Sequence, residues 1–355
     1  MEKEIKMANK WLSDLKKLDS AVDFDYDSYA PENCFYTPSP YLNWLTGNKA
    51  NGFPKNSSIL FFSEPKSGKS FLCLSMIAEM HKRDPEGIAV YVSTELRGQL
   101  QAINFPGVDP DRVLIIDSND PVEIFDELLD QNLKAKVQDG MPLRMIILDS
   151  VTGILGVKRK AAESIEQHLI GDSALTIGNA MQNIVPWCKR NKIMLIGTAQ
   201  IRANIDSNPY AEKTKMQASF AVKHAFEYFI SVKRANAADD KKDLEGKTFE
   251  DEIKDARGNN LINAHKVYAK VEGSSIGPAG RAGVFTISYT HGLINQHEET
   301  FFLGTTTGVI KKEGTRNYFF DDKKWSSKGD CANAIKDDPK LAAAILEEVR
   351  KLDDK

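Results

Sequence analysis

The 355-residue sequence has few of the features that place a protein in a special class. Its four cysteines are widely spaced and form no C-x-x-C pair, a pattern that predicts buried free thiols in a reducing compartment. No run of 18 apolar residues occurs, so we expect no membrane partner. The formal net charge is −3, and no overall positive field therefore points to nucleic acid. These absences leave a globular protein of the cytoplasm, in which any DNA contact must come from local basic clusters.

The most informative stretch is a loop between an apolar strand and a helix. Residues 59–62 suit a buried parallel strand and residues 70–82 a buried helix. The loop between them ends in Gly-Lys-Ser, as phosphate-binding loops do: Lys69 would reach the β and γ oxygens and Ser70 would offer its hydroxyl to Mg²⁺. Ser63 replaces the usual first glycine, and a chance turn is the alternative explanation. The expected loop residues are Glu64, Pro65, Lys66, Ser67, Gly68, Lys69 and Ser70.

Apolar runs and helical patterns alternate along the chain. The expected strands are 59–62, 88–92, 113–116, 145–148 and 193–198. The expected helices between them are 70–82, 96–103, 121–138 and 172–190. This alternation predicts an α/β fold with a mainly parallel central sheet and helices on both faces. In such sheets ligands bind beyond the carboxyl ends of the strands.

Polar residues follow three of these strands at the edge where the loop also lies. Asp149 closes the fourth strand and suits the acidic residue that holds Mg²⁺ in P-loop enzymes. Glu95 is placed to orient or deprotonate an attacking water, and Gln200 to sense the γ-phosphate. Each alone has an ordinary explanation as a helix cap, a solvated carboxylate or a loop hydrogen-bonding residue. Their coincidence at one sheet edge favours a catalytic site.

The order of these parts resembles that of the RecA-type strand-exchange recombinases, with the bacteriophage UvsX branch as the nearest match. The resemblance extends from about residue 37 to the C-terminus, and its most specific segments are 64–70, 107–113, 147–151, 171–174 and 200–202. It implies a RecA-like P-loop ATPase core with an N-terminal helix and a small C-terminal α/β domain. The implied boundaries are 1–36 for the N-terminal polymerisation helix and linker, 37–292 for the core and 293–355 for the C-terminal domain.

The resemblance also implies roles for single residues. Lys69, Glu95 and Gln200 would form the catalytic group of a DNA-dependent ATPase, with Gln200 coupling ATP to the DNA-binding loops. Ser70 and Asp149 would hold the metal, so ATP and Mg²⁺ are the implied cofactors.

Further cofactor contacts follow from the same resemblance. Lys223 and Lys270 would face ATP held by the adjacent subunit, and Arg281 is a candidate for a charge that relatives supply with a second lysine. His297 stands where relatives have an aromatic ring that stacks on adenine. Lysines that extend from strand edges into water and a satisfied surface histidine are the ordinary alternatives.

Two loops, about 156–171 and about 203–217, are expected to contact DNA. Their basic side chains would neutralise phosphates without reading a base sequence. A solvated charge run is the ordinary explanation, but the first loop directly follows the strand that ends at Asp149, which favours DNA. The expected contact residues are Lys158, Arg159, Lys160, Arg202, Lys213 and Lys215.

Outside this core, residues 3–18 have the apolar stripe of an amphipathic helix, which would dock on a neighbouring subunit or fold back on its own core. Residues 235–263 are polar and predict a protruding hairpin or a partly disordered insert. Near the C-terminus we expect two short strands, at 308–312 and 317–320, and then two helices separated at Pro339.

The function implied is that of an ATP-dependent homologous recombination protein that forms filaments on single-stranded DNA and exchanges strands with homologous duplex DNA. Its partners would be both DNA forms, further copies of itself in a helical filament or ring, and a single-strand-binding protein and a mediator. A phage-encoded protein acting in the host cytoplasm fits the UvsX resemblance. The alternatives are a hexameric RecA-fold helicase and a non-catalytic recombination mediator that binds ATP and DNA.

Overall fold

The computed structural model describes residues 13, 29–103, 105–158, 171–203, 214–216, 220–235, 241–254 and 257–353. Only the backbone is described at 202–203, 214–216, 220–221, 223 and 250–254. The helix expected at 3–18 lies outside the described residues, apart from one position. Within the described ranges, no helix has the length and apolar character needed to cross a bilayer.

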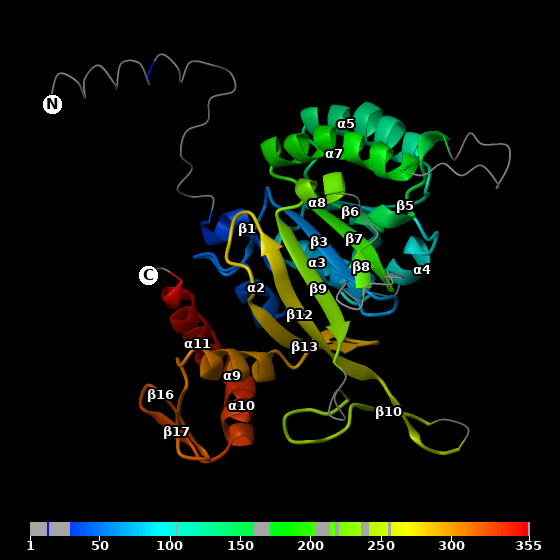
Figure 1. Cartoon of the computed structure of the whole chain (residues 1–355). Coiled ribbons are helices and arrows are strands. Elements are labelled where there is room, and N and C mark those ends of the chain that lie inside the picture. Colours follow the sequence, from blue (N-terminus) through cyan, green and yellow to red (C-terminus); the bar gives the residue numbers. More distant parts are fainter. Residues whose placement is uncertain are drawn as a thin grey trace, which may run out of the picture.

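A ten-stranded sheet forms the centre of the molecule (Figure 1). Its strands are β3 (Ser58–Ser63), β4 (Ile88–Ser93), β5 (Val113–Asp117), β6 (Leu143–Asp149), β7 (Met194–Ala203), β8 (Thr214–Met216), β9 (Tyr228–Arg234), β12 (Ala264–Ser274), β13 (Ala282–Ser288) and β14 (Gly292–Ile294). In space they follow the order β14, β13, β12, β9, β3, β7, β6, β4, β5, with β8 paired to β7. Neighbours from β9 through β5 are parallel, whereas those from β9 to β14 are antiparallel. The expected α/β fold with a mainly parallel central sheet is confirmed.

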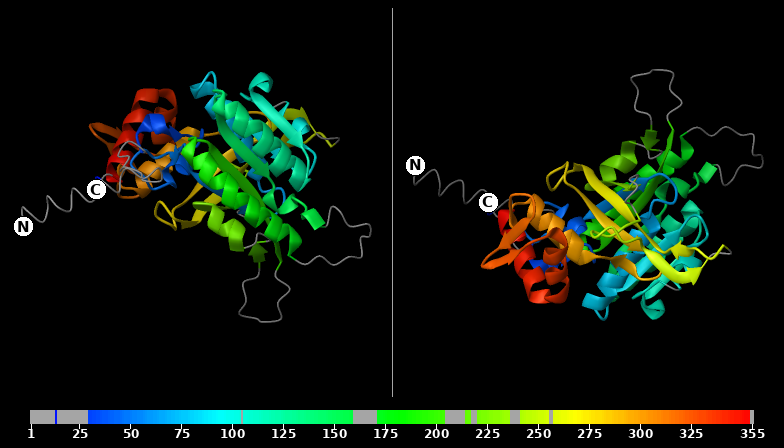
Figure 2. Two further views of the ribbon diagram at one scale, coloured as in Figure 1. Left: turned by 90° about the horizontal axis from the view of Figure 1, so that it is seen from above. Right: turned by 90° about the horizontal axis from the view of Figure 1, so that it is seen from below.

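Helices cover both faces of the sheet (Figures 1 and 2). They are α2 (Pro40–Trp44), α3 (Lys69–Arg83), α4 (Gly98–Ala102), η3 (Val122–Leu133), α5 (Lys134–Gln138), α7 (Asp172–Arg190) and α8 (Phe220–Ala225). Because side chains alternate along a strand, β3 supplies Ile59 and Phe61 to the core under α3, and Leu60 to the core under η3, α7 and α8. The helix expected at 121–138 is present, and its η3 part winds as a π-helix.

The segment 107–113 holds the far end of α3. Arg112 donates from Nη1 to the carbonyl oxygens of Asp84 at 2.9 Å and Pro85 at 3.0 Å, and from Nη2 to the carbonyl of His81 at 3.2 Å. Its Nε donates to the Asp109 carboxylate at 2.8 Å. These bonds satisfy carbonyl groups that a helix end leaves without intrahelical partners. The segment therefore supports the helix that begins at the phosphate-binding loop.

A small lobe follows the sheet and lies beside α2 (Figures 1 and 2). It consists of α9 (Gln296–Thr306), the antiparallel strands β15 (Lys311–Glu313), β16 (Asn317–Phe320) and β17 (Lys323–Trp325), and helices α10 (Lys328–Asp337) and α11 (Pro339–Leu352). Pro339 begins α11, which confirms the expected break between two helices. The lobe has a hydrophobic core of its own, which includes Phe301, Ile310 and Ile335.

The polar insert corrects the expectation for residues 235–263. Leu244 is buried in the core of the C-terminal lobe, and its backbone N–H donates to Oε1 of Glu298 at 3.0 Å. Nδ2 of Asn333 donates to Oε1 of Glu245 at 2.9 Å. Next in the chain, β10 (Glu250–Lys254) and β11 (Asn260–Ile262) form an antiparallel two-stranded ribbon, as expected for a hairpin. Residues 241–249 do form a hairpin, since Lys242 and Thr248 pair in antiparallel fashion. The hairpin packs on the lobe instead of protruding, because the buried Leu244 anchors it there.

A buried carboxyl group joins α9 to the start of α2. One carboxyl oxygen of Glu299 accepts hydrogen bonds from the Ser39 hydroxyl and, at 3.3 Å, from the Tyr41 backbone N–H. Burial raises the pKa of Glu299 to about 8, from an ordinary value of 4.5, and these hydrogen bonds offset the shift only in part. The folded protein therefore holds this group protonated at neutral pH.

We expect Glu299 to make stability depend on pH. Its folded-state pKa is raised, so its contribution is fully present below about pH 4.5 and is lost as the pH rises through about 8. The wild-type free energy of unfolding should therefore fall over this window, on the order of a few kcal/mol more than that of Glu299→Gln. Urea denaturation at roughly pH 5 and roughly pH 9 measures the difference. Glu313→Gln, at an exposed position on β15, should follow the wild type, and parallel pH curves for Glu299→Gln and wild type would contradict the prediction.

Candidate nucleotide-binding site

The loop at 64–70 connects β3 to α3 at the carboxyl edge of the sheet. Since β3 lies between β7 and β9, the loop emerges from the middle of the sheet. Gly68 has a φ of 96°, and a Cβ atom there would lie 2.7 Å from Cδ1 of Ile287 on β13. Both the positive φ and the close approach favour glycine. The loop therefore has the strand–loop–helix setting that phosphate binding requires.

Lys69 is buried at the first position of α3, with 8% of its surface exposed. Its Nζ donates to Oγ of Ser63 at 2.7 Å, to the Ser63 carbonyl at 3.4 Å and to the Glu64 carbonyl at 3.1 Å. Burial lowers the pKa of Lys69, and the nearby Asp149 charge opposes that shift. The ammonium group is thus retained by oxygens of its own loop.

Asp149 ends β6 between side chains of the two neighbouring strands. Its Oδ2 accepts from the Tyr91 hydroxyl on β4 at 2.5 Å, and its Oδ1 accepts from the Thr198 hydroxyl on β7 at 2.5 Å. Burial, reinforced by the Asp149 charge, raises the pKa of Tyr91 well above its ordinary value, so the phenol stays protonated and donates. Tyr91 and Thr198 orient the carboxylate, yet the strand pattern alone did not single them out.

Ser70 lies near the same tyrosine, since its side chain slightly opposes the rise in the pKa of Tyr91. Within the described part of the chain, no group of three or more His, Cys, Asp or Glu side chains is arranged to hold a metal. Mg²⁺ needs only one or two protein ligands where phosphates and water supply the others. A hydroxyl and a carboxylate are hard oxygen ligands of this kind, so Ser70 and Asp149 fit Mg²⁺ bound together with a nucleotide.

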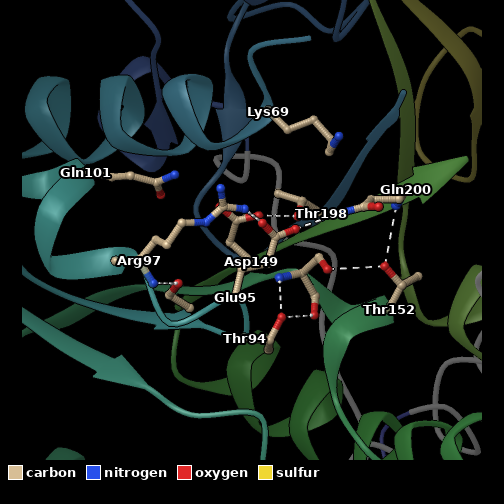
Figure 3. A network of polar contacts seen from close by, with 12 residues as sticks. Lys69, Thr94, Glu95, Arg97, Gln101, Asp149, Thr152, Thr198 and Gln200 are labelled. Carbon is tan, nitrogen blue, oxygen red and sulfur yellow. Dashed lines mark hydrogen bonds and ion pairs between the residues drawn. The ribbon is translucent and has the colours of Figure 1, made fainter. Parts of the chain in front are cut away.

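Glu95 and Gln200 lie together at the same edge (Figure 3). Nε2 of Gln200 donates to Oε1 of Glu95 at 2.7 Å, and Arg97 forms an ion pair with the other carboxylate oxygen. The Gln200 backbone N–H donates to the Thr152 hydroxyl at 3.4 Å. Both Glu95 oxygens are therefore engaged by side chains of this chain. Arg97 and Thr152 were not predicted from the sequence, because no periodic pattern marks them.

Strand register explains why these residues meet. In the parallel pairs, Ser63 on β3 lies opposite Gln200 on β7, and Ser93 on β4 lies opposite Asp149 on β6. Thr94 then connects the two strand ends, since its hydroxyl accepts from the backbone N–H of Ser150 at 2.9 Å. The phosphate-binding loop and the three predicted strand ends consequently share one edge.

Lys223 and Lys270 were expected to face ATP of an adjacent subunit. Lys270 on β12 forms an ion pair with Glu272 at 2.6 Å, and both side chains are about one-third exposed. Lys223 lies on α8, but its side chain is outside the described residues. Arg281 pairs with Asp353, and its guanidinium lies 4.5 Å from the centre of the Trp44 ring. Arg281 is thus engaged within the subunit, and its role as a second charge on ATP stays a prediction.

His297 lies at the first turn of α9, in a pocket of about 200 Å³ between the 241–249 segment and the C-terminal lobe. Burial and the charge of Lys336 lower the pKa of His297. The pocket is lined by no residue of the phosphate-binding loop. The structure therefore provides no contact that supports the predicted stacking of His297 on adenine.

Few of the predicted DNA contacts fall where side chains are described. Arg159, Lys160 and Lys213 lie outside the described residues, and Arg202 and Lys215 have only a described backbone, in which they face each other across β7 and β8. Lys158 is exposed and lines a pocket of about 380 Å³ between η3 and α7, together with Asp126, Asp130 and Asp172. These acidic neighbours give its surroundings a mixed charge.

The phosphate-binding loop on a central parallel strand, with an acidic residue at the end of a nearby strand, is the arrangement of P-loop nucleotide-binding proteins. The RecA N-terminal domain family matches residues 34–265, which is more than half of the chain, and the protein belongs to this family. Protein RecA of Paracoccus denitrificans is 26% identical over 302 residues, covering 84% of this chain and 76% of that protein. Protein RecA of Thermotoga sp. (strain RQ2) is 25% identical over 334 residues, covering 92% and 85%.

We expect Tyr91→Phe to weaken the metal site while leaving the core packed. The variant keeps the ring but loses the hydroxyl that orients Asp149, so the Mg²⁺ concentration for half-maximal binding of a fluorescent ATP analogue should rise about 10-fold. Titration of Mg²⁺ at a fixed analogue concentration measures this. Tyr36→Phe, whose hydroxyl contacts the Ala50 carbonyl outside the site, serves as the control. An equal Mg²⁺ requirement in both variants would show that Tyr91 does not position the ligand.

Proposed function

We propose that this protein is an ATP-dependent homologous recombination protein that forms filaments on single-stranded DNA and exchanges strands with homologous duplex DNA. The observation that carries the proposal is the 2.7 Å hydrogen bond from Gln200 to Glu95. This bond connects Glu95, whose carboxylate is suited to activating water, with β7, the strand that leads into the second predicted DNA loop. Membership of the RecA N-terminal domain family supports the same function.

ATP hydrolysis requires held phosphates, a metal and an oriented water. The loop at 64–70 and Lys69 would hold the triphosphate, while Ser70 and Asp149 would hold Mg²⁺. When bound, Mg²⁺ would neutralise charge on the phosphate oxygens. Glu95 would orient the attacking water and accept its proton. The burial of Lys69 strengthens its attraction for phosphate, because the surroundings screen the charge less than water does.

The contacts of Glu95 suggest how DNA would stimulate hydrolysis. Gln200 and Arg97 engage both of its oxygens, so a shift of β7 that moves Gln200 would free one oxygen for water. Residues 204–213, between β7 and β8, belong to the second predicted DNA loop. DNA bound there would act on Gln200 through the backbone of β7. By thermodynamic linkage, ATP and DNA would then raise each other's affinity.

DNA would be held through its phosphates, because the predicted contacts are lysine and arginine side chains. Loops of this kind present no helix to a groove, so binding would not depend on base sequence. The proposed contacts are Lys158, Arg159, Lys160, Arg202, Lys213 and Lys215.

The assembly proposed is a filament with ATP between subunits. Lys223 and Lys270 would contact ATP of the neighbouring subunit, and residues 1–36 would join one 37–292 core to the next, with 293–355 as a separate C-terminal domain. We place the protein nearest the bacteriophage UvsX branch, acting in the host cytoplasm with a single-strand-binding protein and a mediator as partners.

The assigned base is tested with Glu95→Gln, which removes the proton acceptor and keeps the shape. Hydrolysis of ATP in the presence of single-stranded DNA should fall about 100-fold or more, while DNA binding with a non-hydrolysable ATP analogue stays near the wild-type level. A phosphate-release assay and fluorescence anisotropy measure the two. Glu86→Gln, at an exposed position after α3, should keep wild-type hydrolysis. Undiminished turnover in Glu95→Gln would refute the assignment, and absence of turnover in the wild type would favour a non-catalytic mediator.

The assembly is tested by electron microscopy of the full chain. The protein is imaged with single-stranded DNA, with a non-hydrolysable ATP analogue, and with both ligands. Because ATP and DNA would each favour the same assembled state, we expect helical filaments that need both ligands. Closed rings around DNA would instead support a helicase.

A further inference from the structure

Ser63 differs from the glycine usually found at this position of a phosphate-binding loop, and the structure gives its hydroxyl a specific partner. The side chain is buried, with 1% of the residue exposed. Its Oγ lies 2.7 Å from Nζ of Lys69, the shortest of the three contacts that the ammonium group makes. A glycine could not make this contact.

Every N–H donor of the Lys69 ammonium group has an acceptor in the loop. An ammonium group has three N–H donors, and three oxygens accept them: Oγ of Ser63, the Ser63 carbonyl and the Glu64 carbonyl. The Ser63 hydroxyl donates its own hydrogen to the Glu64 carbonyl at 2.8 Å, which leaves a lone pair directed at Lys69. The buried charge is therefore satisfied without any ligand.

We propose that Ser63 is a positioning residue of the nucleotide site, whose hydroxyl retains Lys69 within the loop until the phosphates of a bound nucleotide take the ammonium group from it. The inference rests on the proposed binding of ATP. It makes the serine a determinant of nucleotide affinity, because a contact present only in the free protein opposes binding.

Ser63 also lies next to the strand that carries Gln200. Ser63 is the last residue of β3 and lies opposite Gln200 in the parallel pair with β7. Gln200 in turn donates to Glu95. The release of Lys69 from Ser63 would therefore occur beside the end of β7, where Gln200 engages Glu95, the proposed base. A movement of Lys69 and a movement of Gln200 would thus take place next to the same serine.

The test compares Ser63→Ala and Ser63→Gly with the wild-type full chain. A hydrogen bond from a charged donor in a buried site favours the free state, so its loss should tighten binding of a fluorescent non-hydrolysable ATP analogue about 10-fold. KM for ATP should fall by a similar factor with kcat unchanged, since the contact is absent in both the bound ground state and the transition state. Ser63→Gly restores the usual loop residue and tests the hydroxyl in a second backbone context.

Ser75→Ala is the matched control, since it removes a buried hydroxyl of α3 that donates to the Phe71 carbonyl at 2.9 Å and does not touch Lys69. It should bind the analogue as the wild type does. A fall in kcat with unchanged affinity in both Ser63 variants would overturn the inference, because the serine would then act in the transition state. Unchanged affinity and unchanged kcat would overturn it as well. Failure of the wild-type protein to bind the analogue would instead overturn the proposed function.

Discussion

The arrangement of the site depends on parallel strand register at one edge of the sheet. Parallel neighbours direct their carboxyl ends the same way, so residues that follow separate strands, far apart in the chain, come together there. Ser63 meets Gln200 and Ser93 meets Asp149 for this reason. If one strand shifted by one residue against its neighbour, its side chains would point to the opposite faces of the sheet, and residues of one hydrophobic core would enter the other. The packing of β3 between two hydrophobic cores therefore also fixes the chemistry of the edge.

Burial at this edge requires that each polar group has partners within the protein. Lys69 is satisfied by its own loop, and Asp149 by hydroxyl groups from the strands on either side. An unpaired charge is costly where little water reaches it, so Tyr91 and Thr198 stabilise the half-buried Asp149 carboxylate as well as orienting it. The contacts of Asp149 orient its carboxylate in the absence of a ligand, which limits the reorganisation that metal binding requires. Lys69, by contrast, would have to leave the oxygens of its own loop to reach a phosphate.

The C-terminal lobe is attached to the core at several separate points. Leu244 inserts into the core of the lobe, Glu299 bonds to the segment before α2, and Arg281, directly before β13, pairs with Asp353 at the end of α11. These contacts lie on different elements, so movement of the lobe would have to break them together. The 241–249 segment is thus part of the interface between sheet and lobe, a role that its polar composition did not indicate.

Local pattern in the sequence was sufficient for the parallel sheet, the covering helices, the loop at 64–70 and the strand-end residues Glu95, Asp149 and Gln200, because alternation and strand–loop–helix order are properties of neighbouring residues. The family resemblance added further residues, among them His297, whose pocket in the structure includes no residue of the loop. Only the tertiary structure decided which side chains bind these residues. Tyr91 and Thr198 donate hydrogen bonds to Asp149, Ser63 accepts one from Lys69, and Arg97 pairs with Glu95. The physical reason is that a hydrogen bond between strands depends on register and spatial order, which no local pattern contains.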